Sequence, residues 1–215
     1  MTVFKPAGIP VFPPHDDEHG DCVLRRLLRD APEVSDVHWP DGFAGGIAHR
    51  LDVSTSGALW VAESTEELER MRERFSQGQL RKTYYLRVAR RPSWTHNQVD
   101  RPVAHDRRKR RRMTVQRGPN TPHRGRWYPA STTFTHRHGD VFQAVITTGV
   151  MHQIRVHAAF VGIPLLGDGL YGGGETPPDA PDGLRFFLHH EGLVDPDGWG
   201  TDPVRTPEWA SPQRA

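Results

Sequence analysis

Hydrophobic positions recur along the chain in two spacings, one typical of helices and the other of short strands. The clearest helix is expected after Ser64, because Glu67 stands where a capping box requires it. The apolar side chains that follow share one helical face: Leu68, Met71 and Phe75. Weaker patterns predict a short helix capped by Asp21 and a further helix over residues 152–161.

Short apolar or alternating runs predict strands. Residues 57–62 are apolar throughout, which favours a buried central strand, and residues 83–88 are rich in aromatic and β-branched side chains. Residues 132–135 and 141–147 have the pattern of a hairpin around Gly139. Because strands and helices mix without regular alternation, the chain is expected to have an α+β fold.

Three segments lack these periodicities. Residues 91–129 contain many prolines and arginines and predict a loop or extended ribbon outside the core. Residues 172–183 predict a loop, and residues 195–215, rich in Pro, Gly and Asp, predict a loosely ordered tail. A chain of 215 residues is long enough for one domain, so we expect a domain over 1–194 followed by the tail 195–215.

The small net charge of +2 conceals a strong segregation of charge. Residues 81–155 hold 17 of the 28 basic residues but only three of the 26 acidic ones, so the rest of the chain is acidic. Nearly all the basic residues are arginines, whose guanidinium groups match phosphate oxygens and stack on bases. A GC-rich genome would explain the preference for Arg but not the segregation. The pattern therefore points to a polyanionic partner, most simply nucleic acid.

Several classes of protein are disfavoured. Cys22 is the single cysteine, so we expect no intrachain disulfide and no cysteine-based metal cage. No apolar run approaches the roughly 20 residues of a membrane span, and the first residues lack the pattern of a secretory signal. We expect a cytoplasmic protein without membrane contact, and find no metal-ligand spacing, nucleophile elbow or dinucleotide fingerprint.

Asp52 is the strongest candidate for chemistry on the residue pattern alone. It follows His49 and Arg50 and precedes the hydroxyl side chains of Ser54 and Thr55, beside the predicted buried strand. A buried aspartate is costly unless a cation or hydrogen-bond donors satisfy it. Such a carboxylate can act as a nucleophile or base, but it can equally cap a turn through the neighbouring hydroxyl groups.

Two more polar clusters lie in the C-terminal half. The predicted helix at residues 152–157 carries Arg155 near its start, from where the side chain could reach a neighbouring carboxylate. Its two histidines point in different directions, so a shared metal ion is not expected. Residues 167–172 are punctuated by glycine but lack the strand and helix of a phosphate-binding loop, and they predict a structural turn.

Ordered sequence blocks carry a family resemblance. The block at residues 49–57 reads HRLDVSTSG, residues 5–8 read KPAG, and residues 82–84 read KTY. Residues 148–172 form a longer block around HQIRVH, and a weaker block covers residues 185–193. In order and spacing these blocks resemble the RluA-type RNA pseudouridine synthases over about residues 4–194.

The resemblance implies an activity, a fold and three catalytic residues. Members of this family isomerise uridine in RNA, here ribosomal or transfer RNA, to pseudouridine without a metal or cofactor. Their domain has a mixed, mostly antiparallel central sheet flanked by helices and loops. Asp52 matches the aspartate that bonds transiently to the nucleotide, at the base or the sugar C1′. Tyr84 matches the tyrosine that stacks on the target base, and Arg155 the arginine paired with the aspartate.

The remaining site residues fall into two groups. We expect one group to shape the cleft and bind substrate: His49, Arg50, Thr55, Lys82, His152 and Gln153. We expect the other, a basic run, to contact the RNA backbone: Arg107, Arg108, Lys109, Arg110, Arg111 and Arg112. The alternative for the basic run is a solvated loop with no partner.

The sequence departs from the family pattern at Val150, where relatives usually have an arginine. This departure favours an alternative function, a non-catalytic RNA-binding or chaperone protein that retains the fold. Because the KPAG block begins at Lys5, we expect no N-terminal RNA-binding module, and we expect a monomer. A carboxylate-dependent nuclease or glycosidase would need a second acidic residue or a metal site that the pattern does not offer.

Overall fold

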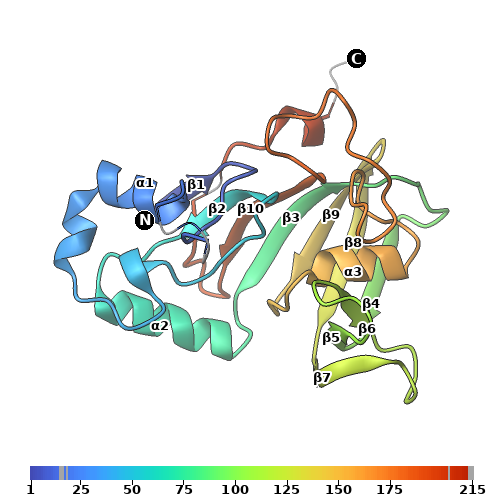
Figure 1. The fold of residues 1–215 in the computed structure, drawn as a ribbon, viewed down its shortest axis with the longest axis horizontal. Helices are drawn as coiled ribbons and strands as arrows, with labels where there is room; N and C mark the ends of the chain where they lie inside the picture. The colour runs from blue at the N-terminus through green and yellow to red at the C-terminus, as the bar shows by residue number, and fades with distance from the viewer. Residues whose placement is uncertain (15–16, 18, 203, 213–215) are drawn as a thin grey trace.

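One seven-stranded sheet forms the body of the molecule, with a second, three-stranded sheet below it (Figure 1). The computed structural model describes residues 1–14, 17, 19–202 and 204–212. The large sheet has the order β1-β2-β10-β3-β9-β8-β4, and the small sheet has the order β6-β5-β7. The strands are β1 Thr2–Lys5, β2 Ser56–Trp60, β3 Arg81–Arg87, β4 His96–Asp100, β5 Val103–Asp106, β6 Met113–Val115, β7 His123–Tyr128, β8 Ser131–His138, β9 Val141–Ile146 and β10 Leu188–Val194.

The sheet is mixed but mostly antiparallel. Only β2 and β10 pair in parallel among the described strands, and all other neighbours run in opposite directions. The helices are α1 Val23–Asp30, α2 Thr65–Ser76 and α3 Gln153–Phe160. This arrangement confirms the α+β fold class, and the hairpin expected around Gly139 is formed by β8 and β9.

Strand β2 is buried on both of its faces, which accounts for its unbroken apolar run. Leu59 belongs to the main core, to which α1 contributes Leu27. Trp60 points the other way, into a second core with Leu68 and Met71 of α2. Because successive residues of a strand face opposite sides, a strand between two apolar layers needs apolar residues at every position. Asp52, the candidate catalytic residue, lies four residues before this strand.

The helix signals of the sequence are confirmed for α2 and corrected for α1. Ser64 caps α2, its hydroxyl oxygen accepting the amide of Glu67 at 3.2 Å. Helix α1 instead has Cys22 as its N-cap, without a side-chain cap. Asp21 pairs with Arg26 and not with the helix amides. The expected capping by Asp21 is therefore wrong, since its carboxylate is engaged by a guanidinium.

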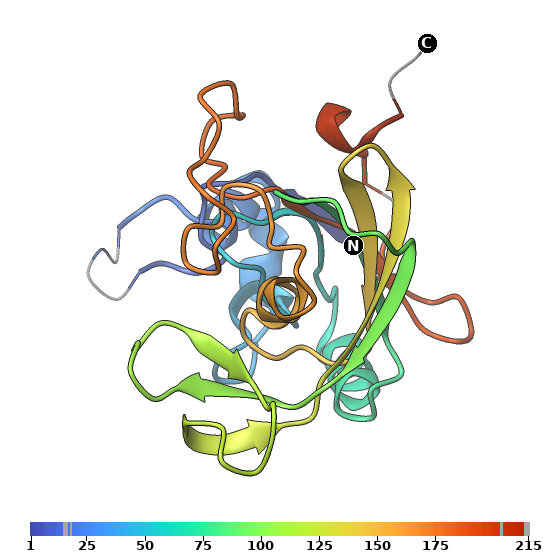
Figure 2. The same ribbon diagram turned by 90° about the vertical axis from the view of Figure 1, so that its right-hand side faces the viewer.

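The expectation of a loop outside the core over residues 91–129 is wrong in part. This segment contains β4 and the small sheet, and Val103, Met113 and Val115 are buried. They pack in a separate cluster against Val156 of α3 and Tyr171. Figure 2 shows the small sheet set apart from the large sheet, with α3 between them. These strands escape sequence patterns because they are short: β5 has four residues and β6 has three.

The segment after residue 194 also differs from the loosely ordered tail expected. Asp195 is buried and accepts the amides of Asp197 and Trp199 at 2.9 and 2.8 Å. The ring of Trp199 lies 4.2 Å from that of Trp60, and Ala210 is 3% exposed. These residues pack on the domain because they carry apolar side chains among the prolines. Residues 203 and 213–215 of the predicted tail lie outside the described part of the chain.

Among the described residues, no helix has the length and apolar character needed to cross a membrane.

Candidate active site

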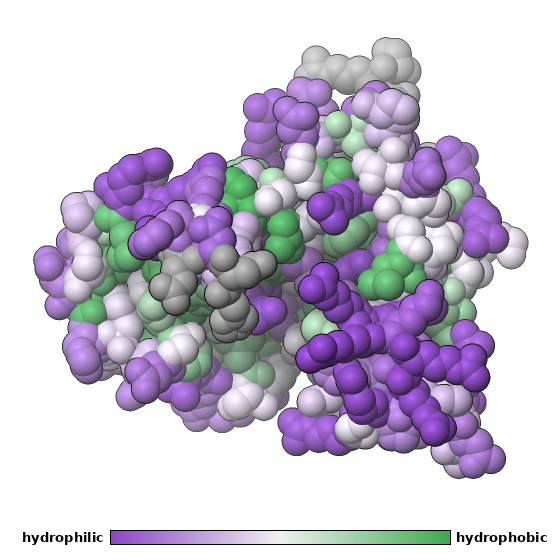
Figure 3. All heavy atoms as spheres, in the orientation of Figure 1, coloured by the Kyte–Doolittle hydropathy of each residue, from purple (hydrophilic) through white to green (hydrophobic). Residues whose placement is uncertain are grey.

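A cleft of about 660 Å³ opens where the loop before β2, strands β3 and β9 and the start of α3 meet. Figure 3 shows the hollow near the middle of this face, beside the strongly hydrophilic side chains over the small sheet. Every residue that the sequence suggested for catalysis or cleft binding lines it: His49, Arg50, Asp52, Thr55, Lys82, Tyr84, His152, Gln153 and Arg155. The volume lies within the range of about 300–1,000 Å³ typical of small-molecule pockets.

Asp52 is paired with a buried arginine at the wall of this cleft. Arg155 donates from Nη1 to Oδ2 of Asp52 at 3.0 Å, although the two residues are 103 positions apart. The side chain of Asp52 is 30% exposed, whereas that of Arg155 is 8% exposed. The carboxylate is therefore open to the cleft while its cation is shielded. The expectation that Arg155 reaches a neighbouring carboxylate is confirmed.

The other side of Arg155 is held by Asp168, which lies in the segment that the sequence predicts to be a purely structural turn. The guanidinium donates from Nε and Nη2 to the two oxygens of Asp168 at 2.7 and 3.0 Å. Burial alone would lower the pKa of Arg155, but its hydrogen bonds to Asp168 and the charges of Asp168 and Asp52 raise it above its ordinary value. Arg155 therefore stays a cation. Asp168 is part of the site, and its signal in the sequence is only its place in the long C-terminal block.

The loop that carries Asp52 is fastened from behind by Lys5. The Nζ of Lys5 donates to the carbonyl oxygens of Val53 and Thr55 at 2.9 and 2.7 Å, and Lys5 is fully buried. The amide of Thr55 donates to the carbonyl of Asp52 at 2.9 Å. Burial lowers the pKa of Lys5 to about 8, against the opposing charge of Asp52. These bonds fix the backbone so that Asp52 is presented to the cleft.

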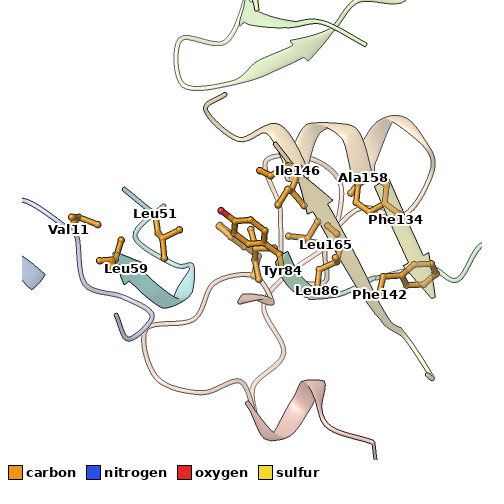
Figure 4. Packing of buried hydrophobic residues seen from close by; sticks show 14 of the residues in the cluster. Val11, Leu51, Leu59, Tyr84, Leu86, Phe134, Phe142, Ile146, Ala158 and Leu165 are labelled. Atoms are coloured by element: carbon orange, nitrogen blue, oxygen red, sulfur yellow. The ribbon is translucent and has the colours of Figure 1, made fainter. Parts of the chain in front are cut away.

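Tyr84 stands between the core and the cleft. It comes from β3, is 7% exposed, and its ring lies 4.5 Å from the ring of His190, tilted by 31°. Figure 4 shows Tyr84 among the buried apolar side chains of the main core. Burial and, secondarily, the charge of Asp52 raise the pKa of Tyr84 strongly, so its hydroxyl keeps its proton. An aromatic ring held this firmly offers a flat surface to a planar ligand.

His152 lies at the start of α3, facing Asp52. Its Nε2 is 3.8 Å from Oδ2 of Asp52, and its Nδ1 is 2.9 Å from the hydroxyl of Tyr171. It has a left-handed backbone with φ of 55°, the only positive φ among described residues other than glycine. Such a conformation costs of order 1 kcal/mol or more and commonly occurs at functional positions. Tyr171, like Asp168, lies in the segment predicted to be a structural turn.

The other predicted cleft residues differ in what they contact. His49 accepts the amide of Trp60 at Nε2, and Gln153 binds Thr148 and Ser131, so both hold neighbouring segments of the chain. A direct contact of either residue with substrate stays a prediction.

Two further cleft residues carry positive charge. Lys82 is buried, which lowers its pKa to about 8, and it donates to the carbonyl of Thr148 at 3.0 Å. Arg50 is exposed at the edge of the cleft. Their contacts with substrate also stay predictions.

The basic run occupies the turn between β5 and β6 and lies outside the cleft lining. Asp106 organises the turn by accepting the amides of Arg108 and Lys109 at 2.8 and 3.0 Å. The first five side chains are exposed and Arg112 is half-buried. Within the described part of the chain, none of the six pairs with a carboxylate. Their charges are available to a partner.

The described residues contain no group of three or more His, Cys, Asp or Glu side chains placed to hold a metal ion. What the site does contain is an ion-paired carboxylate, open to a cleft and flanked by a fixed aromatic ring. Such an arrangement is suited to catalysis by a carboxylate, on an α+β domain with a basic surface beside the site.

Comparisons with known proteins identify the family. The family described as RNA pseudouridylate synthase matches residues 1–160. The chain is 32% identical over 203 residues to the dual-specificity RNA pseudouridine synthase RluA of Escherichia coli (strain K12), covering 90% of this chain and 81% of the relative. It is 33% identical over 195 residues to ribosomal large subunit pseudouridine synthase D of Nitrosomonas europaea, covering 88% of this chain and 53% of that one.

A solved structure agrees on the fold. Human RNA pseudouridylate synthase domain containing 4 superimposes with a TM-score of 0.69 at 22% identity, covering 97% of this chain and 86% of the other. The chain belongs to the RNA pseudouridylate synthase family. It is an enzyme that isomerises uridine in RNA to pseudouridine, and the resemblance found in its sequence blocks is confirmed.

Proposed function

We propose that Asp52 is the nucleophile of this isomerase, with Arg155 as its ion-pair partner and Tyr84 as the ring that stacks on the target uracil. The observation that carries the proposal is the arrangement of Asp52, accessible from the cleft but bonded to an arginine that is itself locked by Asp168. A nucleophilic carboxylate needs both an approach for the substrate and a cation that does not move.

The resemblance to the family implies the chemistry that we propose for this site. The target uridine leaves its stack and enters the cleft, at a cost of a few kcal/mol that stacking on Tyr84 helps to offset. Asp52 forms a transient covalent bond with the nucleotide, and the bond between uracil N1 and sugar C1′ breaks. The uracil turns over, its C5 bonds to C1′, and the carboxylate is released. C5 then loses its proton, and N1, whose bond to C1′ has been broken, takes one up. The atoms of uridine and pseudouridine are the same, so no other reactant is consumed.

We further propose that the basic turn over residues 107–112 binds the RNA backbone. Its support is the exposure of five of its side chains, the absence of acidic partners among the described residues, and its position beside the cleft (Figure 3). Guanidinium groups bind phosphate oxygens in a bidentate manner. In this proposal the basic turn takes over part of the RNA contact of the arginine that the family pattern has where this chain has Val150.

The substrate is proposed to be ribosomal or transfer RNA, modified in the cytoplasm by a monomer. Relatives named as a dual-specificity RNA synthase and as a ribosomal large subunit synthase support this substrate class. The unpaired, buried Cys22 is consistent with a reducing compartment. Size-exclusion chromatography with light scattering tests the monomer, which a mass near twice 24.3 kDa would contradict.

The decisive experiment compares the wild-type chain with Asp52→Asn on RNA from cells that lack the protein. Pseudouridine is mapped by chemical labelling, and we expect a site that appears with the wild type and disappears with Asp52→Asn. Asp30→Asn, which removes an exposed carboxylate paired with Arg29, is the matched control and should keep full activity. Modification by Asp52→Asn at the wild-type rate would refute the nucleophile, and RNA binding without modification by the wild type would favour a binding protein.

A further inference from the structure

The hydroxyl group of Tyr171 lies between a backbone amide and the ring of His152. The amide of Met113 donates to this oxygen at 2.9 Å, and Nδ1 of His152 lies 2.9 Å away on its other side. A backbone amide can only donate, so the hydroxyl oxygen is the acceptor in the first bond. The described residues offer its proton no acceptor other than Nδ1 of His152.

Burial sets the protonation states of Tyr171 and His152. Burial raises the pKa of Tyr171 to about 12, so the hydroxyl has a proton to donate at neutral pH. Burial also lowers the pKa of His152, against the opposing charge of Asp52, so the ring is neutral and carries one proton. When Nδ1 accepts from Tyr171, that proton must be on Nε2.

We propose that Tyr171 is a positioning residue, whose hydroxyl holds His152 in the tautomer that directs Nε2–H toward Asp52. The Nε2 atom is 3.8 Å from Oδ2 of Asp52, and the rings of His152 and Tyr171 stand at 89° to each other. The opposite tautomer would aim a lone pair at the carboxylate and repel it. The left-handed backbone of His152 brings the ring into this place.

The tautomer decides which oxygen of Asp52 reacts, an inference that rests on Asp52 being the nucleophile. Arg155 holds Oδ2 by a hydrogen bond at 3.0 Å, and the Nε2–H of the neutral His152 ring faces the same atom from 3.8 Å, beyond hydrogen-bond distance. Among the described residues, Oδ1 has no hydrogen-bond or ion-pair partner. Arg155 and His152 both favour negative charge on Oδ2, so Oδ1 is the oxygen that we expect to attack.

The position of the Tyr171 hydroxyl depends on the small sheet. Met113 begins β6, directly after the basic turn, and the guanidinium of Arg112 lies 5.5 Å from the ring centre of Tyr171. The other charged or titratable groups that act on His152 are Asp52, Arg155, Asp168 and His105. None of these four groups can replace the Tyr171 hydroxyl. A hydrogen bond to Nδ1 requires a donor where the hydroxyl of Tyr171 lies.

The tautomer can be observed directly, without RNA. Long-range proton–nitrogen spectra of the histidine-labelled chain separate protonated from unprotonated ring nitrogens, and His152→Gln identifies the signal. We expect protonated Nε2 and unprotonated Nδ1 at pH 7 in the wild type, and a mixture of tautomers in Tyr171→Phe. A wild-type ring protonated at Nδ1 would overturn the proposal, and this result is independent of whether Asp52 is the nucleophile. If Tyr171→Phe does not fold, the wild-type spectrum decides alone.

Kinetics provide the second test. Tyr171→Phe should lower kcat by about tenfold or more while KM stays within about twofold, because the carboxylate is misplaced but the cleft is intact. Loss of the bond to neutral Nδ1 should also move the acid limb of the pH–rate profile to higher pH. Tyr85→Phe, which removes a hydroxyl bonded to Glu191 at 3.3 Å, is the matched control with no expected change. An unaltered tautomer and pH profile in Tyr171→Phe would reduce Tyr171 to a structural role.

Discussion

Arg155 bonds a buried carboxylate and the carboxylate of the cleft at the same time. Its guanidinium uses Nε and Nη2 on the buried Asp168 and keeps Nη1 for Asp52. A bidentate pair fixes the plane of the group, so the remaining donor points in one direction only. Asp168 therefore fixes the donor that Arg155 offers to Asp52, although it does not line the cleft.

Replacing Asp168 by Asn should therefore lower both the stability and the activity of the protein. A buried arginine without its bidentate partner is expected to lower the free energy of unfolding by about 3 kcal/mol, as found when one member of a buried pair is removed. The activity, measured as kcat/KM, should fall by about tenfold or more because Nη1 is no longer aimed. Urea unfolding and a single-turnover assay measure the two effects.

The matched control is Asp140→Asn, which breaks the half-exposed pair with Arg87. Solvent already screens that pair, so the expected loss is about 1 kcal/mol or less with unchanged activity. Equal losses of stability and activity in the two variants would contradict the prediction that Asp168 holds Arg155 in place for Asp52.

At the level of elements, the parallel pairing of β2 with β10 requires a glycine at position 57. Gly57 has φ of +129°, and a Cβ there would lie 2.0 Å from the carbonyl oxygen of His190. The two backbones approach too closely for any side chain. This explains physically why a glycine ends the HRLDVSTSG block, just after the loop of Asp52.

Gly57→Ala is expected to destabilise the chain by about 3 kcal/mol or more, because the clash is with backbone and cannot be relieved by a rotamer. Gly118→Ala is the control, since its Cβ would meet nothing within 4 Å and its φ is not in the left-handed region. Thermal unfolding of both variants measures the difference. A Gly57→Ala chain as stable as the control would show that β2 and β10 can separate without cost.

The turn between β5 and β6 is the element on which RNA affinity is expected to depend. Substituting its six basic residues by Ser or Gln should weaken RNA binding and flatten its salt dependence, by about 0.7–0.9 in slope for each phosphate that is no longer neutralised. Binding titrations at several salt concentrations measure the slope. Arg29 and Arg205, exposed arginines outside the small sheet, give a control double substitution. The same slope with and without the basic side chains would mean that the turn does not touch phosphate.

The elements that the sequence predicts well are those with local signals. Helix α2 has its own cap, and the β8–β9 hairpin has its own turn. The roles of Asp168 and Tyr171 depend on partners far along the chain, at Arg155, His152 and Met113, which no local pattern reveals. The small sheet escapes prediction for the same reason, because its strands are short and become buried only against α3.

The whole molecule should lose stability in acid because it buries several neutral histidines. Burial lowers the pKa of His157 and His189 to about 4 and that of His190 to about 3. Between about pH 6.5 and pH 4 the unfolded chain takes up protons on these rings that the folded chain does not, so stability falls as the pH falls. The loss at pH 5 is up to about 2 kcal/mol for each ring.

Urea unfolding at pH 7, 6 and 5 measures this decline, which is expected at constant slope with denaturant. His190→Gln is a useful variant, because it removes one of the three titrating rings and should make the decline shallower. Stability that does not change from pH 7 to pH 5 would mean that the rings can be protonated in the folded state.

The chain leaves the large sheet to form the small sheet and returns to the large sheet at the same place. Asp100 at the end of β4 pairs with Ser131 at the start of β8, so residues 101–130 form an excursion between two neighbouring positions. An insertion with adjacent ends can change in length and sequence without shifting the register of the strands that carry Tyr84 and align the cleft. The RNA contacts proposed for the basic turn can therefore change while the cleft stays the same, provided that a backbone amide still meets Tyr171 at the position of Met113.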